Sequence, residues 1–363
     1  MDFIYATWAG YPVWAWAGFA IFILTMLALD LGILNRKAHA ITYREAATWS
    51  AIWVSLALVF AGLVFWQQGR LTGVEFLTGY VIELSLSVDN LFVFLLIFGY
   101  FNVPAKYQHR VLFWGVLGAL VMRMTMIALG AALIERFHWI IYVFGAFLVY
   151  TGVRMMLQKE TEAHPEENFL VRFFSRLIPM TRHYDGEKFF TEVDGKRVGT
   201  LMLLVLITVE VTDLVFAVDS IPAIFGITTN TFIVYTSNVF AILGLRSLYF
   251  LLAGVVEKFH YLKIGLSIVL AFVGVKMLTE GFISGRFGLS KETIIIGSLT
   301  FVAVVLASSV VASLIWPQHA ETRVEVELPP GFDSPFDDDA GRHGAEDPQL
   351  PQGERARGQG AEG

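Results

Sequence analysis

Cysteine is absent from the 363 residues of this chain, and charged residues make up only 16% of it. The first absence excludes disulfides, thiolate metal sites and cysteine nucleophiles together. The second excludes an ordinary soluble domain, in which about 25% of residues are charged. Basic residues form no stripe suited to nucleic acid. Residues 1–10 carry no Lys or Arg, so the basic region of a secretory signal is missing.

Long apolar runs take the place of these features. Hydrophobic residues make up 56% of the chain, and the mean hydropathy is +0.62. A transmembrane helix needs about 20 such residues. The pattern predicts an all-α polytopic membrane protein, with the first run as an uncleaved helix. The predicted spans are 11–34, 47–66, 73–99, 110–134, 138–157, 200–226, 231–255, 262–282 and 292–316.

The distribution of Lys and Arg between these runs predicts the orientation. With the N-terminus outside, the inner loops carry fifteen Lys and Arg residues and the outer loops carry four. Basic residues accumulate in cytoplasmic loops. We therefore expect a multi-pass protein of a bacterial inner membrane, with the N-terminus outside and the C-terminus in the cytoplasm.

Two segments lie outside the predicted spans. The loop 158–199 contains an amphipathic stretch, 168–180, that is typical of a helix lying on the membrane surface. Asp194-Gly195 then predicts the turn of a small hairpin. Residues 317–363 are rich in Pro, Gly and acids, and we expect a disordered cytoplasmic tail.

Acidic residues interrupt two of the most apolar runs. Glu83 and Asp89 lie six residues apart in one, and Asp213 and Asp219 have the same spacing in the other. A charge at the centre of a bilayer costs at least about 2.5–3.5 kcal/mol and usually serves a function. Glu210 is a fifth acid in the same spans.

The matching acids belong to an internal repeat. An offset of 130 residues aligns Glu83 with Asp213 and Asp89 with Asp219, and an offset of about 122 aligns later positions. Because the unit has three spans, the second copy must enter the membrane from the opposite side, as in transporters with inverted repeats. The predicted organisation is two N-terminal helices in 1–72, repeats in 73–157 and 200–284 around the loop 158–199, a last helix in 285–316 and the tail 317–363.

The charges of these spans do not balance. Five acids and two arginines, Arg123 and Arg246, would sum to −3 if all were ionised, which is untenable at low dielectric without protons or a cation. Carboxylate and carbonyl oxygens suit Mg²⁺, Ca²⁺ and Mn²⁺. We expect the two arginines to neutralise or gate the site when it is empty. Further oxygen donors are predicted at Ser85, Ser87, Asn90, Ser220 and Asn238.

Helical geometry limits which acids can meet. Glu210 and Asp213 share a helix face, but residues six apart are separated by about 240° around a helix. Asp213 and Asp219 can therefore ligate one ion only if the helix is interrupted. Pro222 is the expected interruption, because it removes the hydrogen bond to the Val218 carbonyl.

Other interpretations of the acids stay open. They could form structural pairs with arginines, a proton relay without metal, or an intramembrane protease dyad. Asp30, near the inner end of its span, is expected to be solvated or to cap its helix. His138 and His260 are expected at the membrane interface and not as metal ligands.

The combined motifs resemble the TerC family of integral membrane proteins, and its Alx-like branch in particular. The resemblance covers about 12–316 and rests on Leu29–His39, Glu83–Asn90, Glu210–Ala223 and Ser237–Arg246. It implies a fold similar to the LysE-type transporter superfamily and export of manganese, and links to tellurite resistance and alkaline pH response. Tyr80 stands where the first repeat would carry a counterpart of Glu210, so the halves are not chemically equivalent.

We therefore expect an Mn²⁺ exporter, with Ca²⁺ as an alternative ion and proton coupling left open. Glu83, Asp89, Glu210, Asp213 and Asp219 are the predicted ligands, acting in turn. An enzyme activity and a bound cofactor are not expected, and the partners are the ion and the lipid bilayer. The rival hypothesis from another class is a membrane scaffold or assembly factor.

Overall fold

The computed structural model describes residues 7–8, 11–32, 43–157, 179–181, 183–193, 195–252, 260–287 and 290–316. Within these ranges the chain forms nine helices and two short antiparallel strand pairs, so the predicted all-α fold is confirmed. Each helix matches one predicted apolar run to within a few residues. The helices are α2 (Val13–Gly32), α3 (Tyr43–Gln68), α4 (Arg70–Tyr100), α5 (Ala105–Arg136), α6 (Ile140–Leu157), α8 (Leu201–Phe225), α9 (Thr231–Leu252), α10 (His260–Phe287) and α11 (Lys291–Ile315).

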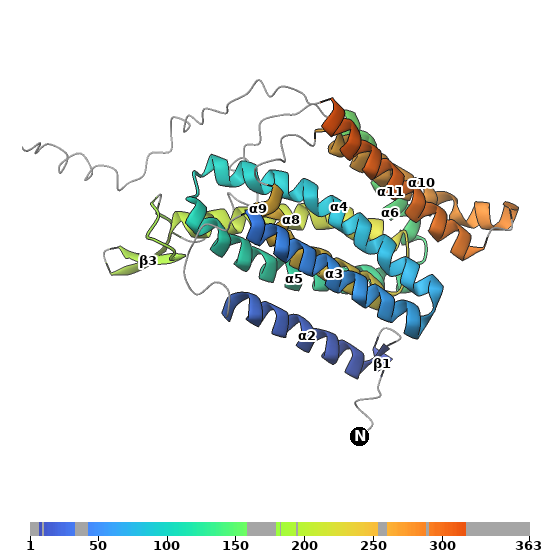
Figure 1. The fold of residues 1–363 in the computed structure, drawn as a ribbon, viewed down its shortest axis with the longest axis horizontal. Coiled ribbons are helices and arrows are strands. Elements are labelled where there is room, and N and C mark those ends of the chain that lie inside the picture. Colours follow the sequence, from blue (N-terminus) through green and yellow to red (C-terminus); the bar gives the residue numbers. More distant parts are fainter. Residues whose placement is uncertain are drawn as a thin grey trace, which may run out of the picture. The chain divides into compact units, whose positions relative to one another are not determined.

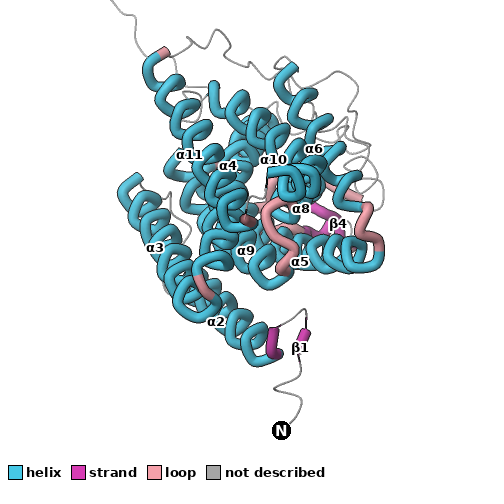
Figure 2. The backbone as a smooth tube through the Cα atoms, turned by 90° about the vertical axis from the view of Figure 1, so that its right-hand side faces the viewer, coloured by secondary structure: helices cyan, strands magenta, loops and turns pink. Residues whose placement is uncertain are grey.

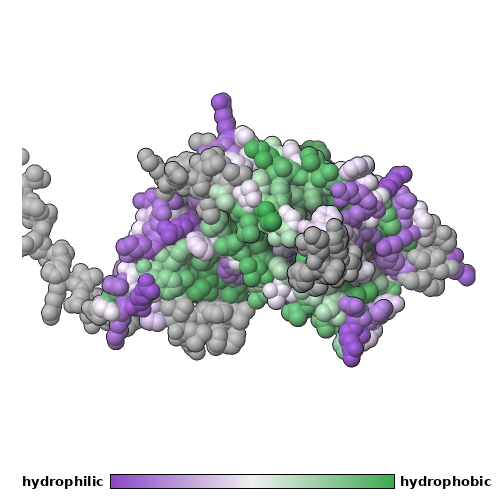
Figure 3. Space-filling model, turned by 90° about the horizontal axis from the view of Figure 1, so that it is seen from below, coloured by the Kyte–Doolittle hydropathy of each residue, from purple (hydrophilic) through white to green (hydrophobic). Residues whose placement is uncertain are grey.

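The composition of the helices explains why they would cross a membrane. Eight helices in the described ranges are long and apolar enough to span a bilayer, and α2 contributes a shorter apolar stretch over Val13–Ala28. On the face shown in Figure 3, hydrophobic residues occupy the middle and hydrophilic residues lie toward the two ends. Helices that are apolar on all sides are typical of membrane spans.

The helices of the two predicted repeats pack against each other in matched pairs. α4 packs on α9, α5 on α8 and α6 on α10, with α9 enclosed by α3, α4 and α5 (Figures 1 and 2). In the predicted repeat, α4 corresponds to α8, α5 to α9 and α6 to α10. When each helix is exchanged for its counterpart, the pair α4–α9 becomes α8–α5, and the pair α6–α10 stays the same. Two related three-helix units would pack in this way. The inverted repeat itself stays a prediction.

Helices α6 and α10 pack closely because glycines lie at their contact. A Cβ added to Gly274 would lie 2.6 Å from the Gly145 carbonyl oxygen, and one added to Gly152 would lie 2.7 Å from the Ser267 carbonyl oxygen. Because both neighbours are backbone atoms, they cannot move aside. Small residues of this kind let membrane helices approach closely.

Replacing Gly274 by Ala is therefore expected to destabilise the protein, although Ala favours helices. Overpacking of this type typically costs about 1–3 kcal/mol, and thermal unfolding in detergent measures it. Gly297→Ala is the matched control on α11, since a Cβ there meets nothing within 4 Å. Equal melting temperatures for the two variants would contradict the prediction.

A small hairpin precedes α8, as Asp194-Gly195 predicted. β3 (Phe190–Val193) pairs with β4 (Lys196–Gly199), and Gly195 takes the left-handed φ of 73° that the turn requires. A hydrogen bond from Thr191 and one from Lys188 hold the pKa of Asp185 below its usual range. A second pair, β1 (Thr7–Trp8) with β2 (Tyr11–Pro12), was not predicted.

Some predictions fall outside the described residues. The interfacial helix of 168–180 lies there apart from its last two residues, as does the tail 317–363. The side chains of Asp30 and His260 are likewise outside the description. His138 is exposed in the turn between α5 and α6, in keeping with an interfacial position.

Candidate functional site

A buried arginine joins two of the predicted acids inside the bundle. Arg123, on α5, donates hydrogen bonds from Nε and Nη2 to the two carboxylate oxygens of Asp213 on α8, at 3.2 and 3.0 Å. Its Nη1 donates to Glu83 Oε1 on α4 and, at 3.2 Å, to Ser220 Oγ on α8. The exposed fractions of Arg123, Glu83 and Asp213 are 1%, 0% and 3%. Three helices therefore converge on one guanidinium group.

The charge of this cluster is not fully neutralised. With all groups ionised, Glu83 and Asp213 contribute −2 and Arg123 contributes +1, which leaves −1 in a dry interior. The planar guanidinium matches a carboxylate with two parallel hydrogen bonds, which lysine cannot provide. A buried, unbalanced charge of this kind attracts a cation or a proton.

Glu210 lies beside the cluster because of a glycine on α5. A Cβ at Gly118 would collide with the Glu210 carboxylate, so this half-buried side chain occupies the space that the glycine leaves. Glu210 and Asp213 are three residues apart and share a face of α8. Both acids therefore lie where α5 packs against α8.

Several buried polar atoms on α4 and α9 have no hydrogen-bond partner among the described residues. They include Glu83 Oε2, Ser87 Oγ and both amide atoms of the Asn238 side chain. Glu83 and Ser87 are one turn apart on α4, and Asn238 lies on α9, against which α4 packs. A buried polar group without a partner costs about 1–3 kcal/mol. Oxygen donors in this state fit a hard cation.

Asp89 and Asp219 lie away from the arginine. Asp89, on α4, is half-buried and interacts electrostatically with Lys263 of α10. Asp219, on α8, is also half-buried and interacts with Thr151 and Arg154 of α6. Each aspartate therefore faces the α6–α10 pair, while the predicted donor Asn90 is buried beside Asp89.

Helix α8 continues through Pro222, so the interruption expected there is wrong. The proline lies one turn from the end of the helix, where the loss of one hydrogen bond is tolerated. Without a break, Asp213 and Asp219 keep the separation around the helix that their spacing imposes. They consequently reach different neighbours, Arg123 and α6.

The second predicted arginine serves another contact. Arg246, on α9, places Nη1 3.2 Å from Nε2 of His109 on α5. Because a guanidinium can only donate, the histidine nitrogen must accept. Within the described ranges, no three His, Asp or Glu side chains come close enough together to hold a metal ion. The five acids thus do not form one common site in this conformation.

The arrangement can be compared with known proteins. A model of the integral membrane protein TerC family matches residues 68–321. The chain belongs to the TerC family. It is 55% identical over 307 residues to an uncharacterized membrane protein of Myxococcus xanthus, covering 85% of this chain and 94% of that one.

Two other relatives are similar over about three quarters of the chain. A protein of Escherichia coli K12 named "Putative membrane-bound redox modulator Alx" is 51% identical over 276 residues, covering 74% of this chain and 86% of that one. An uncharacterized membrane protein of Rickettsia bellii is 37% identical, covering 74% and 89%. No solved structure matches. Family and spans together make the chain a multi-pass integral membrane protein.

Sequence reasoning missed two charged residues of this TerC-family chain and underused a third polar one. Glu75 is 4% exposed and Lys276 is 6% exposed, and both lie inside predicted spans. From the sequence, Ser87 was predicted only as one of several further oxygen donors. A usable signal was present, since Glu75, Gly79, Glu83 and Ser87 recur at intervals of four on α4 and are all buried.

Proposed function

We propose that this chain is a transporter that exports a divalent cation, with Mn²⁺ as the first candidate and Ca²⁺ as the second. The observation that carries the proposal is the buried Glu83–Arg123–Asp213 cluster, whose net charge is −1 when all three groups are ionised, with the unpartnered oxygens Glu83 Oε2 and Ser87 Oγ one turn apart on α4. Carboxylate, amide and hydroxyl oxygens favour hard cations. The choice of Mn²⁺ comes from the resemblance to the TerC family.

Arg123 acts in this proposal as a tethered cation. It neutralises Glu83 and Asp213 when no ion is present, and an incoming divalent ion competes for the same carboxylate oxygens. The ion then meets Asp89, Asp219 and Glu210 in turn, which is why these acids need not lie together in one conformation. Protons offer a second way to balance the charge, and exchange of protons for the ion is compatible with the same residues. Arg246, which links α9 to His109 of α5, is the proposed gating residue on α9.

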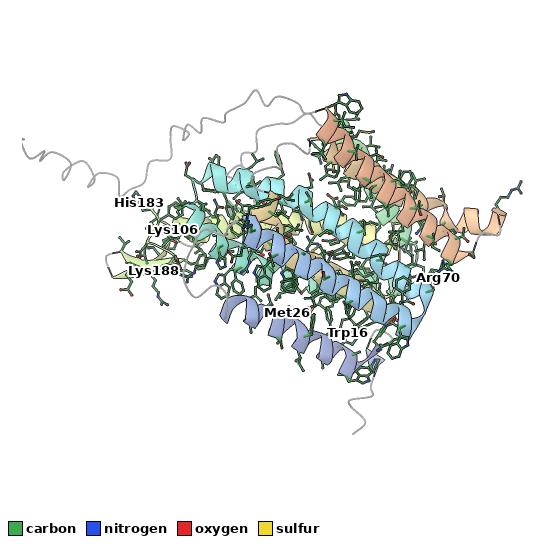
Figure 4. The ribbon with its side chains drawn as sticks, viewed as in Figure 1. Trp16, Met26, Arg70, Lys106, His183 and Lys188 are labelled. Carbon is green, nitrogen blue, oxygen red and sulfur yellow. The ribbon has the colours of Figure 1, made fainter. Side chains whose placement is uncertain are left out.

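The proposed orientation places the hairpin in the cytoplasm of a cell with an inner membrane. Figure 4 shows Lys106, His183 and Lys188 at one end of the helices and Arg70 at the opposite end. The excess of basic residues in the loops at the hairpin end supports its assignment as the inner side. The first helix accordingly starts outside.

Some relatives are named for a redox role, and this chain lacks the side chain needed for one type of redox chemistry. Because there is no cysteine, no side chain can form a thiol–disulfide couple. In this proposal, a redox effect follows indirectly from the supply of a metal ion. We therefore keep cation export as the primary function.

The test is manganese resistance in cells that lack their own exporter. Asp89→Asn and Asp219→Asn are expected to abolish resistance at unchanged protein level, because the amide cannot neutralise the passing cation. Glu135→Gln is the control, since Glu135 is an exposed acid at the end of α5. A scaffold would instead keep its activity in these variants and lose it on changes in the loop 158–199. Uptake of Mn²⁺ and Ca²⁺ into inside-out vesicles separates the two ions.

A further inference from the structure

A second buried acid lies at the opposite end of α4 from the hairpin. Glu75 Oε2 accepts a hydrogen bond from Thr228 Oγ1 at 2.8 Å, and Glu75 Oε1 pairs with Lys291 Nζ at 3.1 Å. Thr228 belongs to the turn between α8 and α9, and Lys291 begins α11. One carboxylate therefore connects three segments that are distant in sequence.

A second lysine closes the same end of the helices. Lys276 Nζ, on α10, donates a hydrogen bond of 3.0 Å to the carbonyl oxygen of Gly226, directly after α8. Lys276 is buried, and its charged neighbours are Glu280, Lys291 and Glu75. One ammonium group thus joins α10 to the turn that follows α8, and the other joins α11 to Glu75 of α4.

Glu75 lies on the same buried face of α4 as the central acid Glu83. Glu75, Gly79, Glu83 and Ser87 follow each other at intervals of four and are all buried. Glu75 and Glu83 are about 12 Å apart along the helix axis. At Gly79, between them, an added Cβ would lie 3.0 Å from Ser237 Oγ of α9. A buried polar line therefore runs from the central acids to Glu75.

The two members of the Glu75–Lys291 pair differ in exposure. The side chain of Glu75 is 6% exposed, whereas that of Lys291 is 57% exposed. The lysine consequently reaches the carboxylate from the solvent side and can leave without crossing the bundle. A carboxylate that is buried only beneath a removable ammonium group is a suitable place for a mobile cation to replace it.

We propose that Glu75, with Thr228, is an outer binding station for the exported divalent cation, and that Lys291 occupies it as a tethered cation while the outer side is closed. The inference rests on the proposed function, because it supplies the exit that cation export requires. Departure of Lys291 opens the station to the outside, and its return expels the ion.

The alternative is that Lys291 only clamps α11 to α4. The chain offers a matched control, since Arg70 of α4 pairs with Glu292 of α11 at 3.2 Å, next to Lys291. That pair is exposed, with 74% and 42% of the two side chains accessible. Arg70→Ala removes a link between the same helices without touching Glu75.

The first experiment measures access from outside and uses the absence of native cysteine. Thr78, fully buried one turn inside Glu75, becomes the only thiol in the variant Thr78→Cys. A membrane-impermeant maleimide added to intact cells is expected to label it slowly. Adding Lys291→Ala should raise the labelling rate roughly tenfold, as expected when a minor open state becomes dominant, while Arg70→Ala should leave it unchanged. Equal rates in the two backgrounds overturn the proposal.

The second experiment measures Mn²⁺ itself with the full-length protein in vesicles. Glu75→Gln is expected to lower export roughly tenfold or more while Mn²⁺ binding to the purified protein persists at the central acids, and Lys291→Arg should retain export. Export by Glu75→Gln at the wild-type rate overturns the station and leaves the exporter standing. If the wild type moves neither Mn²⁺ nor Ca²⁺, the proposed function fails, and the labelling result alone decides whether Lys291 closes the outer side.

Discussion

Replacing Asp213 by Asn is expected to abolish cation export while the protein still reaches the membrane. The amide has the shape of the carboxylate but offers one acceptor atom, so it cannot receive both hydrogen bonds from Arg123. It also removes one of the two negative charges that an ion would meet. The loss of one ion-binding carboxylate is expected to lower the affinity for Mn²⁺ roughly 10- to 100-fold, or about 1.4–2.7 kcal/mol.

Mn²⁺ binding to the purified protein and Mn²⁺ uptake by inside-out vesicles measure this effect. Glu83→Gln is expected to act in the same direction, because Glu83 supplies the unpartnered Oε2 next to Ser87. The exposed residue Glu135 provides the matched control, since Glu135→Gln removes a carboxylate of equal size from the surface. Wild-type uptake by Asp213→Asn would show that the buried pair is structural only.

Most of the fold follows from the sequence because membrane helices obey two simple requirements. Each needs about 20 apolar residues, and each satisfies its own backbone hydrogen bonds. Apolar run length therefore located all nine helices of the described ranges, and Asp194-Gly195 located the hairpin. The pair β1–β2 was missed because its strands have two residues each and carry no periodicity.

The candidate site was less predictable, since it depends on how helices approach each other. Spacing along α8 correctly separates Asp213 from Asp219, but it does not reveal that one reaches Arg123 and the other faces α6. The expected break at Pro222 overestimated the effect of one missing hydrogen bond near a helix end. Likewise, Arg123 and Arg246 were expected to share one role, yet their observed partners differ.

Glu75 illustrates a different limitation. An acid close to the end of a predicted span is easily assigned to the solvated interface, where its charge has little cost. Its burial arises from Thr228, 153 residues later, and from the start of α11. The interval of four residues that Glu75 shares with Glu83 and Ser87 is the sequence feature that fits its position on the same buried face.

Replacing Arg123 by Gln is expected to have the largest effect on stability. Glu83 and Asp213 would remain in a dry interior without their counter-ion, and removing one partner of a buried ion pair costs about 3–5 kcal/mol. The apparent melting temperature in detergent should fall by several degrees. Added Mn²⁺ should restore part of it, because an ion that binds only the folded protein stabilises it by mass action.

A triple variant separates lost packing from unbalanced charge. Combining Arg123→Gln with Glu83→Gln and Asp213→Asn removes all three charges at similar volume, so the melting temperature should recover toward the wild type. The interaction energy of residues in one network makes such changes non-additive. The triple variant should gain nothing from Mn²⁺, because the carboxylates are gone. If Arg123→Gln alone melts like the wild type and ignores Mn²⁺, then the two acids are already neutralised by protons, and the arginine cannot be the group that an incoming cation displaces.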